Sequence, residues 1–506
     1  MKSGNCVLKR TGDALSRVLF FCFAALAAAI LWWTAENLFR ETAPGWMTPV
    51  YLALGGAVTA ALAWLGCLAG RCREKTFCLI LLLCALLVRC AWAAAMDPQL
   101  LSDFGSVYSA ARALAQGVNT MRDSPYFQCW SYQTGYVVWM ALLIRLFGDS
   151  VLMLKLSNAL FSSLSVLLVY LLARRFASRQ GAGGAAMLYL FYPGAWLLTP
   201  VLTNQHLSEC LLLAAVYVYT IPAEGWNKKL PLAAGAGALL TLSNVIRPAA
   251  VTAVLAVAAA AILEVLGRGA PVPGRRRQAA AMAVLAVAVY AGLGAGLSGL
   301  TRATGLNPGG LENNLPQWKF VLGLNQETDG GYSREDADFV FGDDFGNENK
   351  AGAAEQLLRE RTDCPPGELL DLFGRKCGKM WGGFEGTNWV FTGNVTQKMA
   401  EQGMDAARIQ EALQRWSAGL YLWCFLLAAL GGVGAALGPG RHSTAARVLA
   451  LAALAFFCAQ LLVEVQVRYR TLMLACAFPL IALGLDWIRA RWSRRRETTT
   501  ELKSDT

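Results

Sequence analysis

The chain has 506 residues, of which 56% are hydrophobic and 16% charged, and its formal net charge is +11. Ordinary soluble domains carry about 25% charged residues, so this composition excludes a typical soluble protein. The basic excess stands in short segments between apolar runs, which is typical of membrane topology. We therefore expect a polytopic membrane protein with no nucleic-acid partner.

Apolar runs long enough to cross a bilayer recur along the chain. About 20 such residues cross about 30 Å of hydrocarbon as a helix. We predict about twelve membrane-spanning helices, at residues 17–39, 49–70, 76–96, 151–173, 182–200, 207–222, 229–246, 248–267, 279–300, 417–438, 446–464 and 469–488.

Short segments rich in Lys and Arg set the expected orientation, because cytoplasmic loops carry excess positive charge. The seven basic segments are 9–17, 71–75, 173–180, 227–229, 274–278, 440–447 and 489–496. With twelve spans all seven fall on one side of the membrane. The pattern predicts that both termini are cytoplasmic.

Two polar segments, 97–150 and 301–416, fall on the opposite, outer side, where we expect the protein to act. The sequence predicts five parts: an N-terminal pair of transmembrane helices (1–75), a transmembrane catalytic module (76–300) with its first outer loop at 97–150, a large mixed extracytoplasmic loop (301–416), C-terminal transmembrane helices (417–490) and a cytoplasmic tail (491–506).

The first outer loop contains "LSDFGSVYSAARALAQG", which reads as a short amphipathic helix. Ser102 is a candidate N-cap and Gly117 a candidate C′ residue. An apolar stripe is formed by Phe104, Val107, Ala111 and Leu114. The apolar piece at 134–147 is read as re-entrant or interfacial, because a crossing there would invert the basic segment at 173–180.

The second outer loop is dense in Gly, Pro, Asn and Asp, so we expect turns and short elements, with one helix near 351–361. Cys364 and Cys377 both fall on the predicted outer side. A disulfide between them is one alternative in an oxidising compartment, and two free thiols are the other.

Ionisable residues gather at the predicted outer ends of spans that are far apart in sequence. They are Arg89, Asp103, Glu209, Arg247, Glu464, Arg468 and Arg470. Each one alone can be an interfacial charge or a structural pair, such as Glu464 with Arg468 at i,i+4. Together they suit chemistry on a lipid phosphate, since arginines hold phosphate with paired hydrogen bonds and a carboxylate accepts a proton or binds a divalent cation.

Several segments, in this order, resemble the family 39 glycosyltransferases, membrane enzymes of the C-type fold that include protein O-mannosyltransferases and bacterial lipid A aminoarabinose transferases. The resemblance covers most of the chain from about Leu79 to Ala490. Its pieces are "MDPQLLSDFGSVYSAARALAQG", "LIRLFGDSVLMLKLSNALFSSLSVLLVYLLARRF", "YPGAWLLTPVLTNQHLSE", "LSNVIRPAA" and "RYRTLMLACAFPLIALGL". It implies an all-α polytopic fold, and the two spans before Thr76 are extra to the usual module.

The resemblance implies a glycosyltransferase of a bacterial plasma membrane, cell-envelope and mannosyltransferase-like, with an inverting mechanism. A hexosyl or pentosyl group would pass from a polyprenyl-phosphate carrier to a hydroxyl of a lipid, glycan or protein acceptor on the outer face. Asp103 matches the family's catalytic base. Arg468, Tyr469 and Arg470 match its late Arg-Tyr motif and are assigned, with Arg247, to the donor phosphate.

The second outer loop also resembles that of many bacterial relatives, so Lys319, Asn325 and Asp329 are candidates for the acceptor side, with an ordinary turn-rich loop as the alternative. Glu209 and Glu464 are candidate supporting acids. Some family members carry a second acid where this chain has Tyr132 and Gln133. A divalent cation at Asp103 is therefore left open.

Two other classes of function stay as alternatives. A flippase or transporter for lipid-linked sugars would place charges near the bilayer midplane and often shows repeat symmetry, and the sequence shows neither. A scaffold or envelope protein without catalysis is the third reading.

Overall fold

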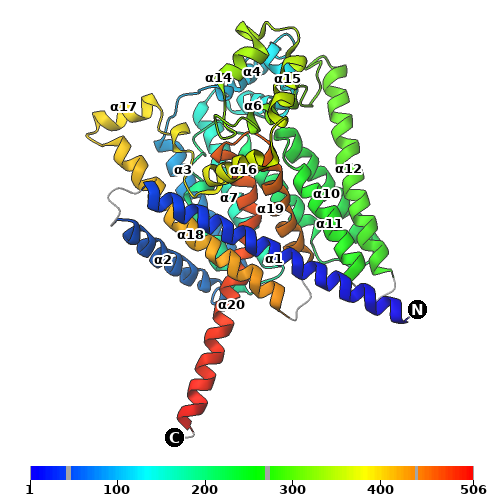
Figure 1. The fold of residues 1–506 in the computed structure, drawn as a ribbon, viewed down its shortest axis with the longest axis vertical. Coiled ribbons are helices and arrows are strands. Elements are labelled where there is room, and N and C mark those ends of the chain that lie inside the picture. Colours follow the sequence, from blue (N-terminus) through cyan, green and yellow to red (C-terminus); the bar gives the residue numbers. More distant parts are fainter. Residues whose placement is uncertain (1, 42–46, 268–273, 439–442, 505–506) are drawn as a thin grey trace.

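The protein folds as a bundle of long helices with a cap of shorter helices at one end (Figure 1). This computed structural model describes residues 2–41, 47–267, 274–438 and 443–504. Within these ranges every regular element is an α-helix or a 3-10 helix. The predicted all-α class is therefore confirmed.

Nine helices in the described ranges are long and apolar enough to cross a bilayer. They are α1 (Lys2–Glu41), α2 (Met47–Gly66), α3 (Glu74–Ala95), α7 (Val151–Ala173), α10 (Trp226–Ile246), α12 (Arg275–Ala303), α18 (Ala406–Leu437), α19 (Thr444–Leu462) and α20 (Thr471–Ser504). The chain is thus a multi-pass membrane protein.

Three of the twelve predicted spans correspond to shorter helices: α8 (Arg179–Phe191), α9 (Gln205–Tyr219) and α11 (Val251–Gly267). The predicted span at 182–200 is wrong in its extent. Helix α8 ends before Pro193, because proline has no N–H to donate and keeps Tyr192 extended, at φ −68° and ψ 119°. A 3-10 turn, η3 (Pro193–Ala195), follows. Twelve crossings remain a prediction.

The predicted N-terminal pair is packed into the bundle. Helix α1 lies along α18 and also contacts α11 and α19, while α2 lies along α8 and α18. The α2–α8 contact needs glycine: a Cβ on Gly66 would lie 2.2 Å from the backbone nitrogen of Gly184. Small residues of this kind let membrane helices approach closely.

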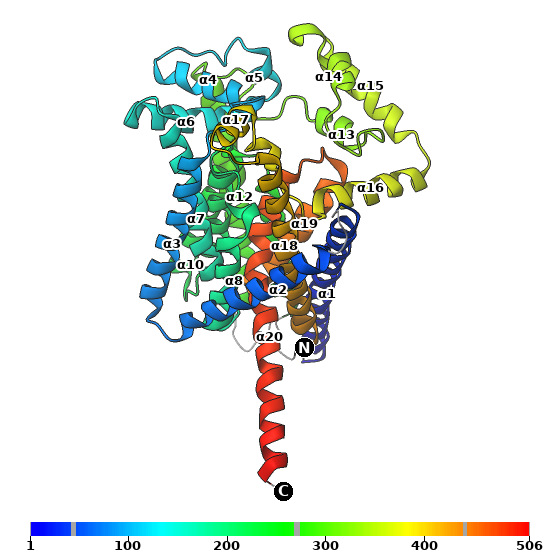
Figure 2. The ribbon, with the colours of Figure 1, turned by 90° about the vertical axis from the view of Figure 1, so that its left-hand side faces the viewer.

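The shorter helices gather at one end of the bundle, and α1 begins and α20 ends towards the other (Figure 2). The cap consists of α4 (Asp103–Ala115), α5 (Pro125–Cys129), η2 (Ser131–Gln133), α6 (Thr134–Phe147), α13 (Gln317–Gly323), α14 (Arg334–Phe341), η4 (Asp343–Phe345), α15 (Lys350–Thr362), α16 (Pro366–Trp381), η5 (Thr387–Trp389) and α17 (Gly393–Glu401). The two predicted outer segments therefore share one end, and α15 confirms the helix expected near 351–361.

The amphipathic helix expected after Leu101 is present as α4. Gly117 follows it with φ +88°, as predicted for a C′ residue. Ser102 is at the N-cap position, as predicted, but its side chain makes no capping hydrogen bond. Phe104, Val107 and Ala111 are buried and pack against protein, chiefly α6 and the segment around Trp389, with Leu114 partly buried beside them.

The predicted boundaries fall inside continuous helices in four places, the first of them at residue 75, within α3. Helix α20 continues through the boundary at 490 to Ser504, so the predicted tail is an extension of a membrane helix. The large loop begins within α12 and ends within α18. Residues 440–442 of the predicted basic segment 440–447 and residues 505–506 of the predicted tail lie outside the described residues.

The thiols of Cys364 and Cys377 are free. Cys377 lies in α16, eleven residues after its first residue Pro366, whereas Cys364 precedes the helix. That stretch of helix rises roughly 16 Å, beyond the reach of a disulfide.

Candidate functional site

A cavity of about 390 Å³ lies where the cap meets the bundle. Its wall combines residues from the first outer segment, from the turn between α10 and α11, from α13 and from the region between α19 and α20. The polar and charged lining residues are Asp103, Tyr132, Gln133, Asn204, Arg247, Asn313, Lys319, Gln460, Glu464, Arg468 and Tyr469. Six of the residues predicted from sequence are thus brought together.

Asp103 is the first residue of α4 and enters the cavity from the side of the first outer segment. Ser102 before it has φ +54° and ψ −136°, a backbone region that residues with a Cβ rarely occupy. The amide of Phe104 closes this tight turn by donating to the carbonyl of Leu101 at 3.2 Å. Strained backbone of this kind is concentrated at functional sites, and here it directs the carboxylate.

The apolar stripe of α4 holds this turn in place. Val107 and Ala111 pack onto α6, and the ring of Phe104 meets that of Trp389 edge-on, with centroids 5.4 Å apart. The hydroxyl of Tyr126 donates to Oδ1 of Asp103 at 3.0 Å. The acid is therefore fixed by packing on one side and by a hydrogen bond on the other.

Two arginines flank the ring of Tyr469. The guanidinium of Arg247 lies 4.7 Å from the ring centroid and that of Arg468 lies 5.3 Å from it. Arg247 donates to Oδ1 of Asn204 at 3.0 Å, and Nε of Arg468 donates to Oε1 of Gln466 at 2.5 Å. Within the described residues neither guanidinium forms an ion pair, so both keep a positive charge for a ligand.

Arg468 is enclosed by aromatic rings, so only 8% of it is exposed. The centroids of Trp389 and Phe104 lie 4.7 Å and 4.9 Å from its guanidinium carbon. Aromatic faces attract a cation without neutralising it. The rings thus orient Arg468 and leave its net charge available.

Lys319 and Glu464 form a neutral pair beside the arginines. Nζ of Lys319 lies 2.5 Å from Oε2 of Glu464, which also accepts from the hydroxyl of Tyr469 at 3.3 Å. Burial opposes the charge on Glu464, but Lys319 outweighs it and lowers the pKa of this carboxyl. Burial also opposes the charge on Lys319, while Tyr469 and Glu464 raise its pKa. Both groups are charged near neutral pH.

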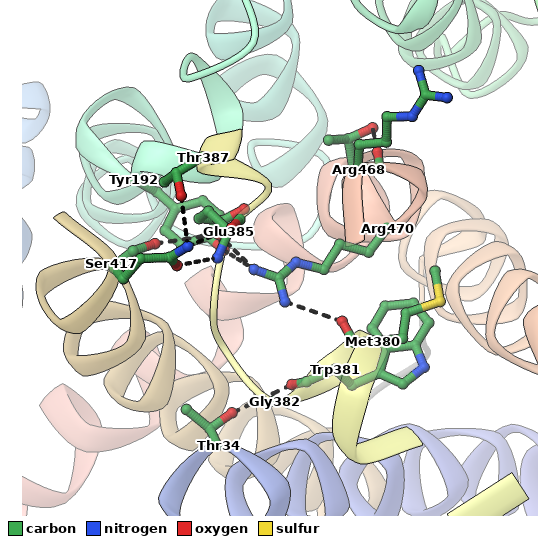
Figure 3. A network of polar contacts seen from close by, with 12 residues as sticks. Thr34, Tyr192, Met380, Trp381, Gly382, Glu385, Thr387, Ser417, Arg468 and Arg470 are labelled. Carbon is green, nitrogen blue, oxygen red and sulfur yellow. Dashed lines mark hydrogen bonds and ion pairs between the residues drawn. The ribbon is translucent and has the colours of Figure 1, made fainter. Parts of the chain in front are cut away.

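Arg470 does not join this group. It is 1% exposed and pairs with Glu385, with Nη2 2.6 Å from Oε1, and Nη1 donates to the carbonyl of Met380 at 3.1 Å. Figure 3 shows Arg468 and Arg470 leaving η6 (Val467–Arg470) in different directions. Tyr192 and Ser417 also donate to Glu385. The structure thus separates two arginines that the sequence analysis assigned together.

Three other predicted residues lie outside the cavity lining. Glu209 is buried in α9 and accepts from the hydroxyl of Tyr189. Asn325 caps the turn after α13, accepting from the amide of Glu327 at 2.9 Å. Asp329 pairs with Arg375 at 2.7 Å and has φ +49°. For Asn325 and Asp329 these contacts are those expected of an ordinary turn-rich loop, the alternative to a role on the acceptor side.

The structure adds residues that sequence reasoning missed. Tyr126, Trp389 and Glu385 touch Asp103, Arg468 and Arg470, respectively. Tyr126 stands in the aromatic stretch "SPYFQCW", whose other rings pack in the core of the cap. Nothing in the local pattern distinguishes the one ring whose hydroxyl meets the acid.

Metal binding at Asp103 stays an untested expectation. Among the residues that the structure describes, no group of three His, Cys, Asp or Glu side chains is placed to hold an ion.

Comparison with known proteins gives a likeness only at the level of solved structures. The chain is similar to the archaeal oligosaccharyltransferase AglB from Archaeoglobus fulgidus in complex with an inhibitory peptide and a dolichol-phosphate, with 14% identity, 84% of this chain and 52% of that chain covered, and a TM-score of 0.47. It is also similar to the apo form of the Archaeoglobus fulgidus oligosaccharyltransferase, with the same identity and coverage and a TM-score of 0.42.

The chain spans about half the length of these two structures. No family model and no curated protein matches it. With TM-scores below 0.5 and 14% identity, these likenesses decide neither fold family nor activity.

The arrangement has a definite chemical capacity. One carboxylate, Asp103, shares a cavity with two cations that lack carboxylate partners, Arg247 and Arg468. The Lys319–Glu464 pair adds no net charge. A singly charged anion bound between the arginines would leave Asp103 free to accept a proton from a neighbouring hydroxyl.

Proposed function

We propose that this protein is a membrane glycosyltransferase that moves a sugar from a polyprenyl-phosphate carrier to an acceptor hydroxyl. The observation that supports the proposal most directly is the placement of Asp103, Arg247 and Arg468 in one cavity. It contains a base and an anion site at the level where the cap meets the apolar bundle, as a lipid phosphate donor requires. The family 39 resemblance of the sequence supports the same reaction.

In the proposed mechanism Asp103 removes the proton of the acceptor hydroxyl. The oxygen attacks the anomeric carbon of the sugar and forms the new glycosidic bond. The bond from that carbon to the phosphate oxygen breaks, and both its electrons leave with the polyprenyl phosphate. One displacement inverts the anomeric configuration.

Arg247 and Arg468 stabilise the phosphate as its charge grows during this step. Donors already aimed at a developing charge lower a barrier without reorganising. The Tyr469 ring between them and the rings around Arg468 provide that preorganisation. Lys319 lies in the same wall, so it remains a candidate for the acceptor side.

The proposal extends to topology and substrates. The basic segments favour cytoplasmic termini and an outward-facing cavity in a bacterial plasma membrane. The sugar is a hexose or pentose, and the acceptor is a lipid, glycan or protein that carries a free hydroxyl. A flippase for the same carrier lipid is the alternative that the experiment must separate.

The test uses the full-length purified protein in proteoliposomes, with radiolabelled polyprenyl-phosphate mannose and glucose as probe donors and a membrane extract as acceptor. The wild type is expected to transfer label to the acceptor. Asp103→Asn should lower the rate by about 100- to 10,000-fold, the usual contribution of general base catalysis. Asp123→Asn, an exposed acid outside the cavity, is the matched control and should keep full activity.

Two outcomes would contradict the proposal. Transfer by Asp103→Asn at the wild-type rate would remove Asp103 as the base. Movement of labelled carrier between leaflets by the wild type, with no glycosylated product, would instead make the protein a flippase.

A further inference from the structure

A hydrogen-bond chain leads from η2 to Asp103. Nε2 of Gln133 donates to the hydroxyl of Tyr126 at 3.4 Å, and this hydroxyl donates to Oδ1 of Asp103 at 3.0 Å. The direction of the chain is determined, because an ionised carboxylate only accepts and the amide NH₂ group only donates. Gln133 is 8% exposed, so the far end of the chain is buried.

Packing holds the Tyr126 ring in position. It contacts Trp130 and Phe127 edge-on, with centroids 4.8 Å and 5.0 Å away. Burial, together with the charge of Asp103, raises the pKa of the Tyr126 phenol. Tyr126 is therefore a permanently protonated donor, and its single hydroxyl proton is committed to Asp103.

We infer that Tyr126 is a positioning residue for the base: it occupies Oδ1 of Asp103 and leaves Oδ2 to accept the proton of the acceptor hydroxyl. This inference rests on the proposed function. It also gives a role to Gln133, which lies in the neighbourhood where some members of the family that the sequence resembles have a second acid. The neutral donor chain here orients the Asp103 carboxylate.

The other groups facing Asp103 are the phenols of Tyr132 and Tyr332, the carboxylate of Glu464 and the cavity cations Arg247, Lys319 and Arg468. Burial raises the pKa of Tyr132 to about 12, and burial also raises that of Tyr332. Neither phenol changes charge below neutral pH, and the cations stay protonated there. Glu464, whose pKa Lys319 lowers, is the same in the wild type and in a variant that lacks only the Tyr126 hydroxyl. A difference between the acid limbs of these two proteins therefore reports on the loss of the hydrogen bond to Asp103.

The experiment measures kcat/KM between pH 4 and 8 for the wild type and for Tyr126→Phe, in the transfer assay described above. Loss of the donor disfavours the ionised carboxylate. The acid limb should move up by about one pH unit, and the maximal rate should fall by about tenfold or more as orientation is lost. Tyr108→Phe is the matched control, because Tyr108, on the helix α4 that also carries Asp103, donates to the remote Asp149 at 2.7 Å.

An unshifted acid limb in Tyr126→Phe overturns the inference, even if the rate is lower at every pH, because a purely structural role would have that effect. If Tyr126→Phe does not fold, Gln133→Leu takes its place and should shift the limb in the same direction by a smaller amount; no shift there also overturns the inference. A failure of the proposed function looks different, since the wild type itself would then form no product.

Discussion

At the residue scale, the charge of the cavity depends on which cations have partners. Lys319 is neutralised by Glu464 and Arg470 by Glu385, whereas in the part of the chain that the structure describes the side chains of Arg247 and Arg468 contact amides and aromatic rings and form no ion pair. Charge pairing therefore identifies the two candidate phosphate ligands among four basic residues. Sequence spacing alone could not make this distinction for Arg468 and Arg470, which are two positions apart.

The replacement Arg468→Gln tests this assignment. It removes one preorganised cation, so kcat should fall by about 100- to 1,000-fold, the effect of losing one such donor. Arg247→Gln should have a similar effect in the same transfer assay. Arg122→Gln, at an exposed position outside the cavity, serves as control. Unchanged kcat in both cavity variants would exclude them as phosphate ligands.

At the scale of elements, α13 is docked onto the end of α19 by a combination of contacts. The amide of Glu464 donates to the carbonyl of Lys319 at 3.0 Å, next to the ion pair of their side chains. Nζ of Lys376, from α16, donates to the carbonyls of Gly323 at 2.5 Å and Leu461 at 2.6 Å. One lysine of α16 thus joins the ends of α13 and α19, and the cavity wall depends on that junction.

Stability should depend on pH through Glu464. Its pKa is lowered in the folded protein, so its stabilising contribution is complete above pH 4.5 and is lost as the pH falls through the folded pKa. Lys319 has a raised pKa, so its contribution is complete below pH 10.5 and is lost only at higher pH.

Thermal unfolding in detergent measures this effect. Glu464→Gln should cost about 1–2 kcal/mol at pH 7, less than for a fully buried pair because Lys319 is partly exposed. Its unfolding temperature should converge with that of the wild type as the pH falls through the lowered pKa of Glu464. Glu312→Gln, in an exposed pair with Arg302, is the control and should change little. Parallel curves for wild type and Glu464→Gln would contradict the prediction.

At the scale of the whole molecule, one segment connects the cap, the bundle and the cavity. We call residues 382–392, between α16 and α17, the strap. Gln414 of α18 bonds both backbone groups of Glu385 at 2.7 Å, and the hydroxyl of Thr392 accepts from the amide of Gln99 at 2.9 Å. The strap also contains Trp389, whose ring packs against the guanidinium of Arg468. The Glu385–Arg470 pair inside it therefore stabilises the fold and, indirectly, the phosphate site.

Glu385→Gln tests the strap. It leaves Arg470 buried without a counter-charge, so the protein should lose about 3–5 kcal/mol of unfolding free energy. The double replacement Glu385→Leu with Arg470→Met should recover most of that loss, because no buried charge remains. Glu355→Gln, in an exposed pair with Arg359, is the control and should cost under about 1 kcal/mol. Equal stability of Glu385→Gln and wild type, measured by thermal unfolding, would contradict the prediction.

The sequence by itself determined the helical membrane class, the two polar segments of the cap, the amphipathic helix at α4 and six residues of the cavity. Hydrophobic run length and charge placement are local properties, so the chain shows them directly. Only the tertiary structure decided that Arg470 pairs with Glu385 and that Tyr126 reaches Asp103. These outcomes depend on contacts between segments that are distant along the chain, and burial and partner geometry, which the sequence pattern does not contain, select among them.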